Sequence, residues 1–591
     1  MSIIYILTII LIIGLHMLIY KKEEKENFLK GLILTISLLL CYNIVTCVIL
    51  SFIKIKSTLI TLSIINTIVI AILGMKIFKD KKIQKYYINK MDILAVISII
   101  IIVVIISIKQ YGIPINIKSS TTDWSTHYLI AEEFYNHSIL LMEENSDLIG
   151  WWNEDFWAPG AYVNTGIVFK VLSPVIEEAY FPQLFVIFEI SMWIFSGILM
   201  YVLLSNSKKS EKQKIIPLIF SIIYILGYPL HTILSGFSYL QVGLNIIITI
   251  LLIMQNDENT LYKYIVLFLS NFGLMFSYYY FAPVVFFAIF VQILIDIKIR
   301  NEKIFSSVNI LKILFALIIP GLFGVMYFIV FQKIKQGTSI FSEFGNVINT
   351  PGPIYDNLIT TILIFLLLSI YNIIKNIKNK KNDFLNTILI VNITLMIGIF
   401  IGMKLQKVSE YYFFKLYYML WVFLLVGAYN AVEYLKEKRK MLIYGGMCLY
   451  CIGMIVSILF NKNILFFDIY QENFRLINED FKIISHEELE IFKYYNNNID
   501  TIENSDDTTY IYVNNVGRSR WVYPLTKNGF IFIDAFYNEP FVDIQQFLDK
   551  ENYKHCIIFK LENEEIYNNI ENVENIKILF KNEAGVIIEK Y

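Results

Sequence analysis

The chain has 591 residues, 56% of them apolar and 17% charged, and its mean hydropathy is +0.58. Basic and acidic residues balance, so the formal net charge is zero. This composition excludes a soluble globular protein, and without a compact basic patch among aromatic residues we also exclude nucleic acid as a partner. Backbone amides in hydrocarbon must be paired within their own segment, so we expect a membrane all-α protein.

Apolar runs long enough to cross roughly 30 Å of hydrocarbon predict about fourteen transmembrane helices. They cover residues 2–20, 31–53, 57–78, 93–108, 183–204, 215–232, 240–255, 262–280, 282–297, 313–332, 358–374, 385–404, 412–435 and 442–460. The stretch 261–300 is broken at Tyr278-Tyr-Tyr-Phe-Ala-Pro283. It fits either two spans or one tilted span with a re-entrant piece. We expect three regions, namely N-terminal helices, a transmembrane core and a soluble tail, over residues 1–92, 93–460 and 461–591.

Lysine placement predicts the side of each loop, because short cytoplasmic loops hold an excess of Lys and Arg. With fourteen spans, four basic clusters share one side, at residues 79–90, 208–214, 375–381 and 436–440. We assign that side to the cytoplasm of a cell membrane, which makes the loop 109–182 and the tail external. The first apolar run has no preceding basic residue and no small-residue cleavage site, so we expect it to remain as a span.

The loop 109–182 holds the candidates for chemistry. It has far more carboxylates than lysines, which suits a general base, a divalent-cation site or simply a solvated acidic surface. Asp123 stands out because it follows the Ser-Ser-Thr-Thr segment 119–122, a natural helix start, and precedes an apolar segment. His127 lies four residues further on, so both share one face of a helix that we expect at the membrane surface.

The tail 461–591 has a different character. Residues 483–497, with Ser485 followed by Glu487 and Glu488, predict a capped amphipathic helix. Short β-rich runs follow at 510–513, 530–533, 556–559 and 586–588. We therefore expect a small extracytoplasmic α/β domain, accessory or acceptor-positioning in function.

The order of these features resembles the GT-C glycosyltransferases, polytopic enzymes that include protein mannosyltransferases and aminoarabinose transferases. In that family the first external loop carries the catalytic aspartate, and the matching residue is Asp123. The family's Pro-Gly turn is similar to Trp157-Ala-Pro-Gly160, and its late aromatic segment with a lysine resembles residues 410–415, Glu-Tyr-Tyr-Phe-Phe-Lys. Many spans followed by a C-terminal external α/β domain complete the resemblance.

The resemblance implies an inverting glycosyltransferase that moves a sugar from a polyprenyl-phosphate donor to a hydroxyl of a cell-envelope glycan, lipid or protein. Asp123 would be the general base. Candidate phosphate or substrate ligands are His127, Tyr412, Lys415, Trp157, Arg518 and Arg520. Carboxylates that would accompany Asp123 at a divalent cation, Mg or Mn, are Glu132, Glu154 and Asp155.

Simpler interpretations stay open for several of these residues. Lys415 also fits an interfacial lysine whose ammonium reaches water, and Trp157 fits the aromatic belt of a membrane protein. Glu189, inside an apolar run, is either functional or a structural hydrogen-bonding group. Two other functions remain for the whole chain, a transporter or flippase of lipid-linked saccharide and a polysaccharide polymerase or assembly protein.

Overall fold

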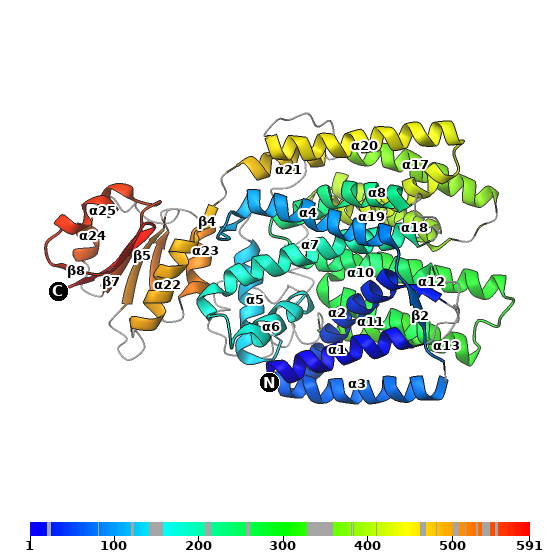
Figure 1. The fold of residues 1–591 in the computed structure, drawn as a ribbon, viewed down its shortest axis with the longest axis horizontal. Helices are drawn as coiled ribbons and strands as arrows, with labels where there is room; N and C mark the ends of the chain where they lie inside the picture. Colours follow the sequence, from blue (N-terminus) through cyan, green and yellow to red (C-terminus); the bar gives the residue numbers. More distant parts are fainter. Residues whose placement is uncertain are drawn as a thin grey trace.

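The structure of the chain is a computed structural model (Figure 1). It describes residues 1–19, 25–80, 82–119, 123–140, 158–206, 214–255, 261–327, 359–379, 381, 383–408, 410–460, 468–479, 482–499, 508–513, 516–526, 530–534, 544–549 and 553–591. A bundle of long helices runs along the longest axis of the molecule, and a smaller domain with a β-sheet lies at one end of it.

Ten helices among the described residues are long and apolar enough to cross a membrane. They are α2 (Phe28–Phe52), α3 (Leu59–Asp80), α4 (Lys90–Tyr111), η3 with α7 (Glu178–Tyr180 and Phe181–Ser205), α8 with α9 (Ile215–Leu226 and Tyr228–Leu234), η5 with α12 (Tyr279–Phe281 and Ala282–Ile299), α13, η6 and α14 (Ser307–Ile313, Leu314–Ile318 and Ile319–Val325), α18 (Phe384–Lys404), the span Phe413–Glu433 within α19 (Glu410–Glu433), and α20 (Glu437–Phe460). The membrane all-α class is thus supported by composition and by structure.

The remaining four predicted spans are also helical, although they are not among these ten. They form α1 (Ser2–Leu18), α10 (Ser238–Met254), α11 (Leu261–Ser277) and α17 (Ile359–Lys378). The stretch around Tyr278 gives two helices, α11 and α12, joined by the short η5 turn, and Pro283 occupies the first turn of α12, where a missing amide costs no hydrogen bond. The count of fourteen spans stays a prediction.

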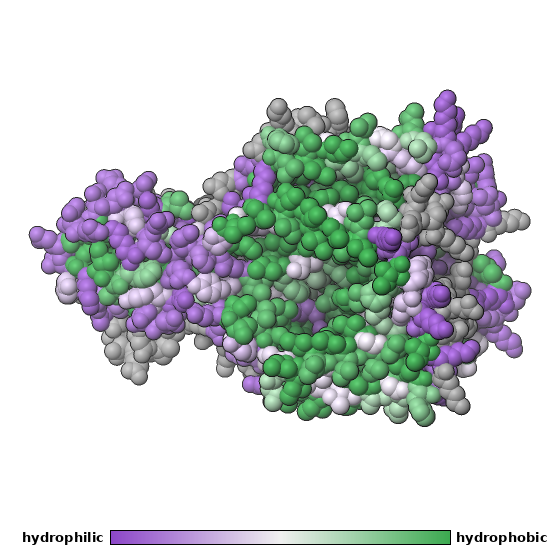
Figure 2. Space-filling model, in the orientation of Figure 1, coloured by the Kyte–Doolittle hydropathy of each residue, from purple (hydrophilic) through white to green (hydrophobic). Residues whose placement is uncertain are grey.

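A broad apolar band covers the face of the bundle that Figure 2 shows, with hydrophilic residues at both ends. One hydrophilic end is the C-terminal domain. The other carries the chain turns between α3 and α4 and between α17 and α18, where basic residues cluster in the sequence. This distribution is expected of helices that cross a bilayer end to end.

Two helices, α5 (Asp123–His137) and α6 (Gly160–Leu172), come from the loop 109–182 and pack on each other beside the C-terminal domain (Figure 1). Gly166 permits the contact, since a Cβ there would lie 2.9 Å from the carbonyl oxygen of Ala131. Residues 124–131 of α5 are all buried. Helix α5 is thus covered by other parts of the protein, including α6 and α23, and its position at the membrane surface stays a prediction.

The C-terminal domain contains a five-stranded sheet in the order β6-β5-β7-β9-β8. The strands are β5 (Thr508–Val513), β6 (Phe530–Asp534), β7 (Tyr553–Phe559), β8 (Ile576–Asn582) and β9 (Gly585–Lys590). Strand β5 pairs parallel with β6 and with β7, whereas β9 pairs antiparallel with β7 and with β8. Its helices are α22 (His486–Asn498), α23 (Val516–Leu525), α24 (Gln545–Leu548) and α25 (Glu564–Asn569). The predicted cap of α22 is confirmed, because Ser485 and Glu488 form a capping box.

Polar contacts join this domain to the bundle. Strand β3 (Ile117–Lys118), which follows α4, pairs antiparallel with β4 (Lys482–Ile484), which follows α21 (Asp468–Asn478). Lys493 forms a 2.8 Å ion pair with Glu177. Helix α23 rests on α5, where the rings of Trp521 and Tyr128 lie 5.3 Å apart.

At the other end of the bundle, β1 (Lys25–Asn27) pairs with β2 (Lys85–Tyr87).

Candidate functional site

Asp123 is the first residue of α5, at the end of the bundle that faces the C-terminal domain. Asp123 as a whole residue is half-buried, whereas the next eight residues are buried. Burial raises the pKa of Asp123 above its ordinary value, and Lys415 and Arg520 act in the opposite direction as nearby positive charges. Two cations from distant parts of the chain therefore interact electrostatically with this carboxylate.

Lys415 lies in the first turns of α19 and is only 4% exposed. Its ammonium donates a 2.8 Å hydrogen bond to the hydroxyl of Tyr239, and it lies 5.3 Å from the ring centres of both Phe237 and Tyr239. A snorkelling lysine would extend its ammonium into water along an apolar surface. Lys415 instead holds its charge among aromatic rings, within electrostatic reach of Asp123.

His127 shares the face of α5 with Asp123 but is fully buried. Its ring stacks on Tyr162 at 5.3 Å and meets Tyr239 edge-on at 4.8 Å. A 2.5 Å hydrogen bond joins His127 Nδ1 to the Tyr162 hydroxyl. Burial, and then the charge of Lys415, hold the pKa of His127 well below its ordinary value. A neutral imidazole packed in this way orients Tyr239 rather than supplying a cation to phosphate.

The two predicted arginines of the tail have different surroundings, although both belong to α23. Arg520 is partly exposed and its charge acts on Asp123. Arg518 is buried, with ion pairs of 2.5 Å to Glu488 and 2.9 Å to Glu562, and it lies over the Phe559 ring. Those two carboxylates favour a structural role for Arg518 inside its own domain.

Several predicted residues fall outside what the structure describes. Trp157, Glu154 and Asp155 lie in the undescribed stretch 141–157, and the side chain of Tyr412 is likewise outside the described part of α19. Glu132 is described, and it accepts a 3.0 Å hydrogen bond from the Tyr128 hydroxyl. Among the residues described, no group of three or more His, Cys, Asp or Glu side chains is arranged to hold a metal ion. A divalent cation stays a prediction.

The structure adds two residues that the sequence analysis did not select for the site, Tyr162 of α6 and Tyr239 of α10. Tyr239 links Lys415 to His127. It follows Gly236, whose φ of +72° suits glycine, and a Cβ on Gly236 would come within 2.5 Å of the Trp124 ring. An aromatic residue after a glycine turn, near the start of an apolar helix, is the signal that would have found it.

Asp123, His127, Tyr162, Tyr239, Lys415 and Arg520 thus form one group, which we call the Asp123 cluster. It combines a carboxyl group with two basic side chains and three aromatic side chains. Such a set can accept a proton and stabilise a phosphate at the same place. No protein-family model matches the chain, and no curated protein is similar to it in sequence. The chemistry of the cluster therefore carries the functional argument.

Proposed function

We propose that the chain is an inverting membrane glycosyltransferase of the GT-C type. It would move a sugar from a polyprenyl-phosphate donor to a hydroxyl acceptor of the cell envelope at the external face of the membrane. The single observation that carries the proposal is the buried ammonium of Lys415, which is hydrogen-bonded to Tyr239 at 2.8 Å and acts electrostatically, together with Arg520 of α23, on the carboxyl group of Asp123. A base next to two cations suits a reaction that creates a negatively charged leaving group.

The proposed step balances as a displacement at the anomeric carbon. The acceptor oxygen forms a bond to that carbon while the bond from the carbon to the phosphate oxygen breaks, and the configuration inverts. Asp123 takes the proton from the acceptor hydroxyl, and polyprenyl phosphate leaves with the bonding electron pair. Lys415 and Arg520 would stabilise the charge that develops on this phosphate.

The position of the cluster supports a lipid-linked donor. Helix α5, which begins at Asp123, lies at the end of the bundle next to the C-terminal domain (Figure 1), where a hydrophobic surface gives way to a hydrophilic one (Figure 2). A prenyl tail in the bilayer and a sugar phosphate at its surface would meet at that level. The basic residues at the opposite end of the bundle favour the cytoplasm for that end, so the cluster would be external.

A transporter or flippase of lipid-linked saccharide is the second candidate. Glu189 favours it, because this acidic residue is only 2% exposed within α7. Ionisable groups inside spans often mark transport pathways. A polysaccharide polymerase has no separate observation in its favour.

Asp123→Asn separates the candidates. Purified protein in nanodiscs would be given polyprenyl-phosphate donors carrying radiolabelled glucose, mannose, galactose or arabinose, with envelope extract as acceptor. Release of free polyprenyl phosphate reports transfer regardless of the sugar. Loss of a positioned general base should lower the rate about 10²- to 10⁴-fold.

Glu133→Gln is the matched control, since Glu133 lies on the same helix and pairs with His137 at 3.3 Å. The control should keep the activity of the unchanged protein. Transfer that is equally fast in Asp123→Asn would refute the proposed base. Failure of every donor to react with the unchanged protein, together with saccharide movement between leaflets, would favour the transporter.

A further inference from the structure

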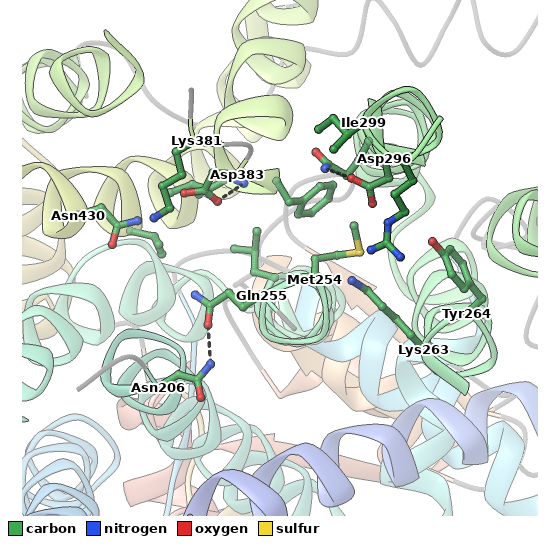
Figure 3. Close-up of a pocket in the computed structure, with 16 residues that line it drawn as sticks. Asn206, Met254, Gln255, Lys263, Tyr264, Asp296, Ile299, Lys381, Asp383 and Asn430 are labelled. Carbon is green, nitrogen blue, oxygen red and sulfur yellow. Dashed lines mark hydrogen bonds between the residues drawn. The ribbon is translucent and has the colours of Figure 1, made fainter. Parts of the chain in front are cut away.

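A second polar site lies at the end of the bundle away from the C-terminal domain (Figure 3). It is an open cavity of about 550 Å³, lined by residues at the ends of α7, α10, α12 and α19 and at the starts of α11 and α18. This volume falls within the range of about 300 to 1,000 Å³ that is usual for small-molecule sites. We call it the basic-end cavity.

Three cations line the basic-end cavity, Lys263, Arg300 and Lys381. Figure 3 shows Lys263 and Lys381 approaching from opposite sides of the end of α10. Two carboxylates, Asp296 and Asp383, share the lining. Among the lining residues, cations therefore outnumber carboxylates, and the balance favours an anion over a metal ion.

The two carboxylates already accept hydrogen bonds from the protein. Asp383 caps α18 by accepting from the backbone amide of Leu385 at 3.1 Å. Asp296 accepts from the Gln292 amide at 2.9 Å, and Gln292 in turn accepts from Thr387 of α18 at 3.0 Å. These bonds tie α12 to α18 and fix the wall of the cavity.

Neutral polar groups complete the lining. Asn206 donates to the Gln255 side-chain oxygen at 3.0 Å, which joins the ends of α7 and α10, and Asn430 lies on α19 (Figure 3). Amide and carboxylate oxygens accept hydrogen bonds from hydroxyl groups, whereas ammonium and guanidinium groups bind phosphate. The lining thus presents partners for both.

We propose that the basic-end cavity binds a phosphate ester that also carries hydroxyl groups. Lys263, Arg300 and Lys381 supply the positive charge that attracts the phosphate, while Asp296, Gln255 and Asn430 accept from the hydroxyls. A glycerol phosphate group has this chemistry, either as the head group of a phospholipid or as a soluble molecule. Apolar side chains of Met254, Ile299 and Phe384 in the same lining suit an attached acyl chain. The proposal does not depend on the reaction assigned to the Asp123 cluster.

Binding to the full-length protein tests the proposal with two probes. In nanodiscs of mixed phosphatidylglycerol and phosphatidylcholine, native mass spectrometry would measure how much phosphatidylglycerol the released protein retains. Separately, titration of sn-glycerol 3-phosphate, with glycerol as the blank, would measure binding of the soluble form. Arg300→Gln and Lys381→Gln should each lower the affinity for the bound probe about tenfold, as loss of one hydrogen bond to a charged group predicts.

Lys378→Gln is the matched control, because Lys378 lies at the same end of the bundle, is exposed on α17 and does not line the cavity. Lys381→Arg should keep binding, which separates loss of charge from loss of fold. Retention of phosphatidylglycerol alone assigns a lipid ligand, and saturable binding of glycerol phosphate assigns a soluble one. Binding of neither probe, or equal binding by the Gln variants and the control, would overturn the proposal.

Discussion

Opposing influences act on the carboxyl group of Asp123. Burial raises its pKa, while the charges of Lys415 and Arg520 limit the rise. A carboxylate with a raised pKa accepts a proton more readily, which helps a general base, but it is also neutralised at a higher pH. The residue therefore needs its cations to stay ionised, and they belong to two different parts of the chain.

The pH dependence of transfer follows from this balance. Only deprotonated Asp123 acts as a base. We therefore expect kcat/KM to be low at pH values below the raised pKa of Asp123 and to rise as the pH passes through that pKa. Arg520→Gln removes a charge that lowers the pKa of Asp123, so the acid limb should move to higher pH. Measurements of kcat/KM across a pH series would give the acid limb of the unchanged protein and that of the Arg520→Gln variant.

Arg475→Gln is the control for this shift, because Arg475 is an exposed arginine of α21 paired with Glu472 and Glu479. Its acid limb should coincide with that of the unchanged protein. An acid limb that moves to lower pH in Arg520→Gln would contradict the proposed coupling.

Among the elements, the turn between α9 and α10 is the most demanding. Gly236 adopts φ +72°, and a Cβ at this position would come within 2.5 Å of Trp124 Cδ1 and 2.8 Å of Ser119 Oγ. This turn presents Tyr239 to Lys415 and contacts the residue next to Asp123. Its shape therefore determines the geometry of the Asp123 cluster.

Gly236→Ala should destabilise the protein by about 1 to 3 kcal/mol, the usual range for a side chain forced into a left-handed conformation. The push on Trp124 should also lower the transfer rate. Thermal unfolding in detergent would measure the first effect. Gly14→Ala is the control, since nothing lies within 4 Å of its Cβ in α1; an equal loss of stability in both variants would show that the turn is not special.

Local pattern predicted much of the fold and less of the site. Apolar runs located the ten helices of membrane-spanning length among the described residues, and Ser485 with Glu488 located the start of α22. Strand β8 was missed because Lys577 and Lys581 interrupt its apolar pattern. Asp123 was recognised at a helix start, but its coupling to Lys415 and Arg520 depends on packing between distant segments. Periodicity carries no information on such packing.

For the whole molecule, the apolar band and its two hydrophilic ends define an axis across the membrane (Figure 2). We predict that the C-terminal domain is external and the basic end cytoplasmic. In a Cys448→Ser background, Asn497→Cys on α22 should react with a membrane-impermeant maleimide in intact cells. Asn379→Cys after α17 should react only once the cells are permeabilised. Both positions are exposed, and the reverse pattern would contradict the assigned orientation.

Helices α10 and α19 both begin beside the Asp123 cluster and end at the basic-end cavity. From Tyr239 to Met254 the rise of an α-helix covers about 22 Å, several times the size of a phosphate group. One molecule's head group cannot occupy both places. If each end holds a phosphate, two separate ligands are needed, one from each leaflet or its adjoining solution. Helices α10 and α19 then fix the distance between the two ligands.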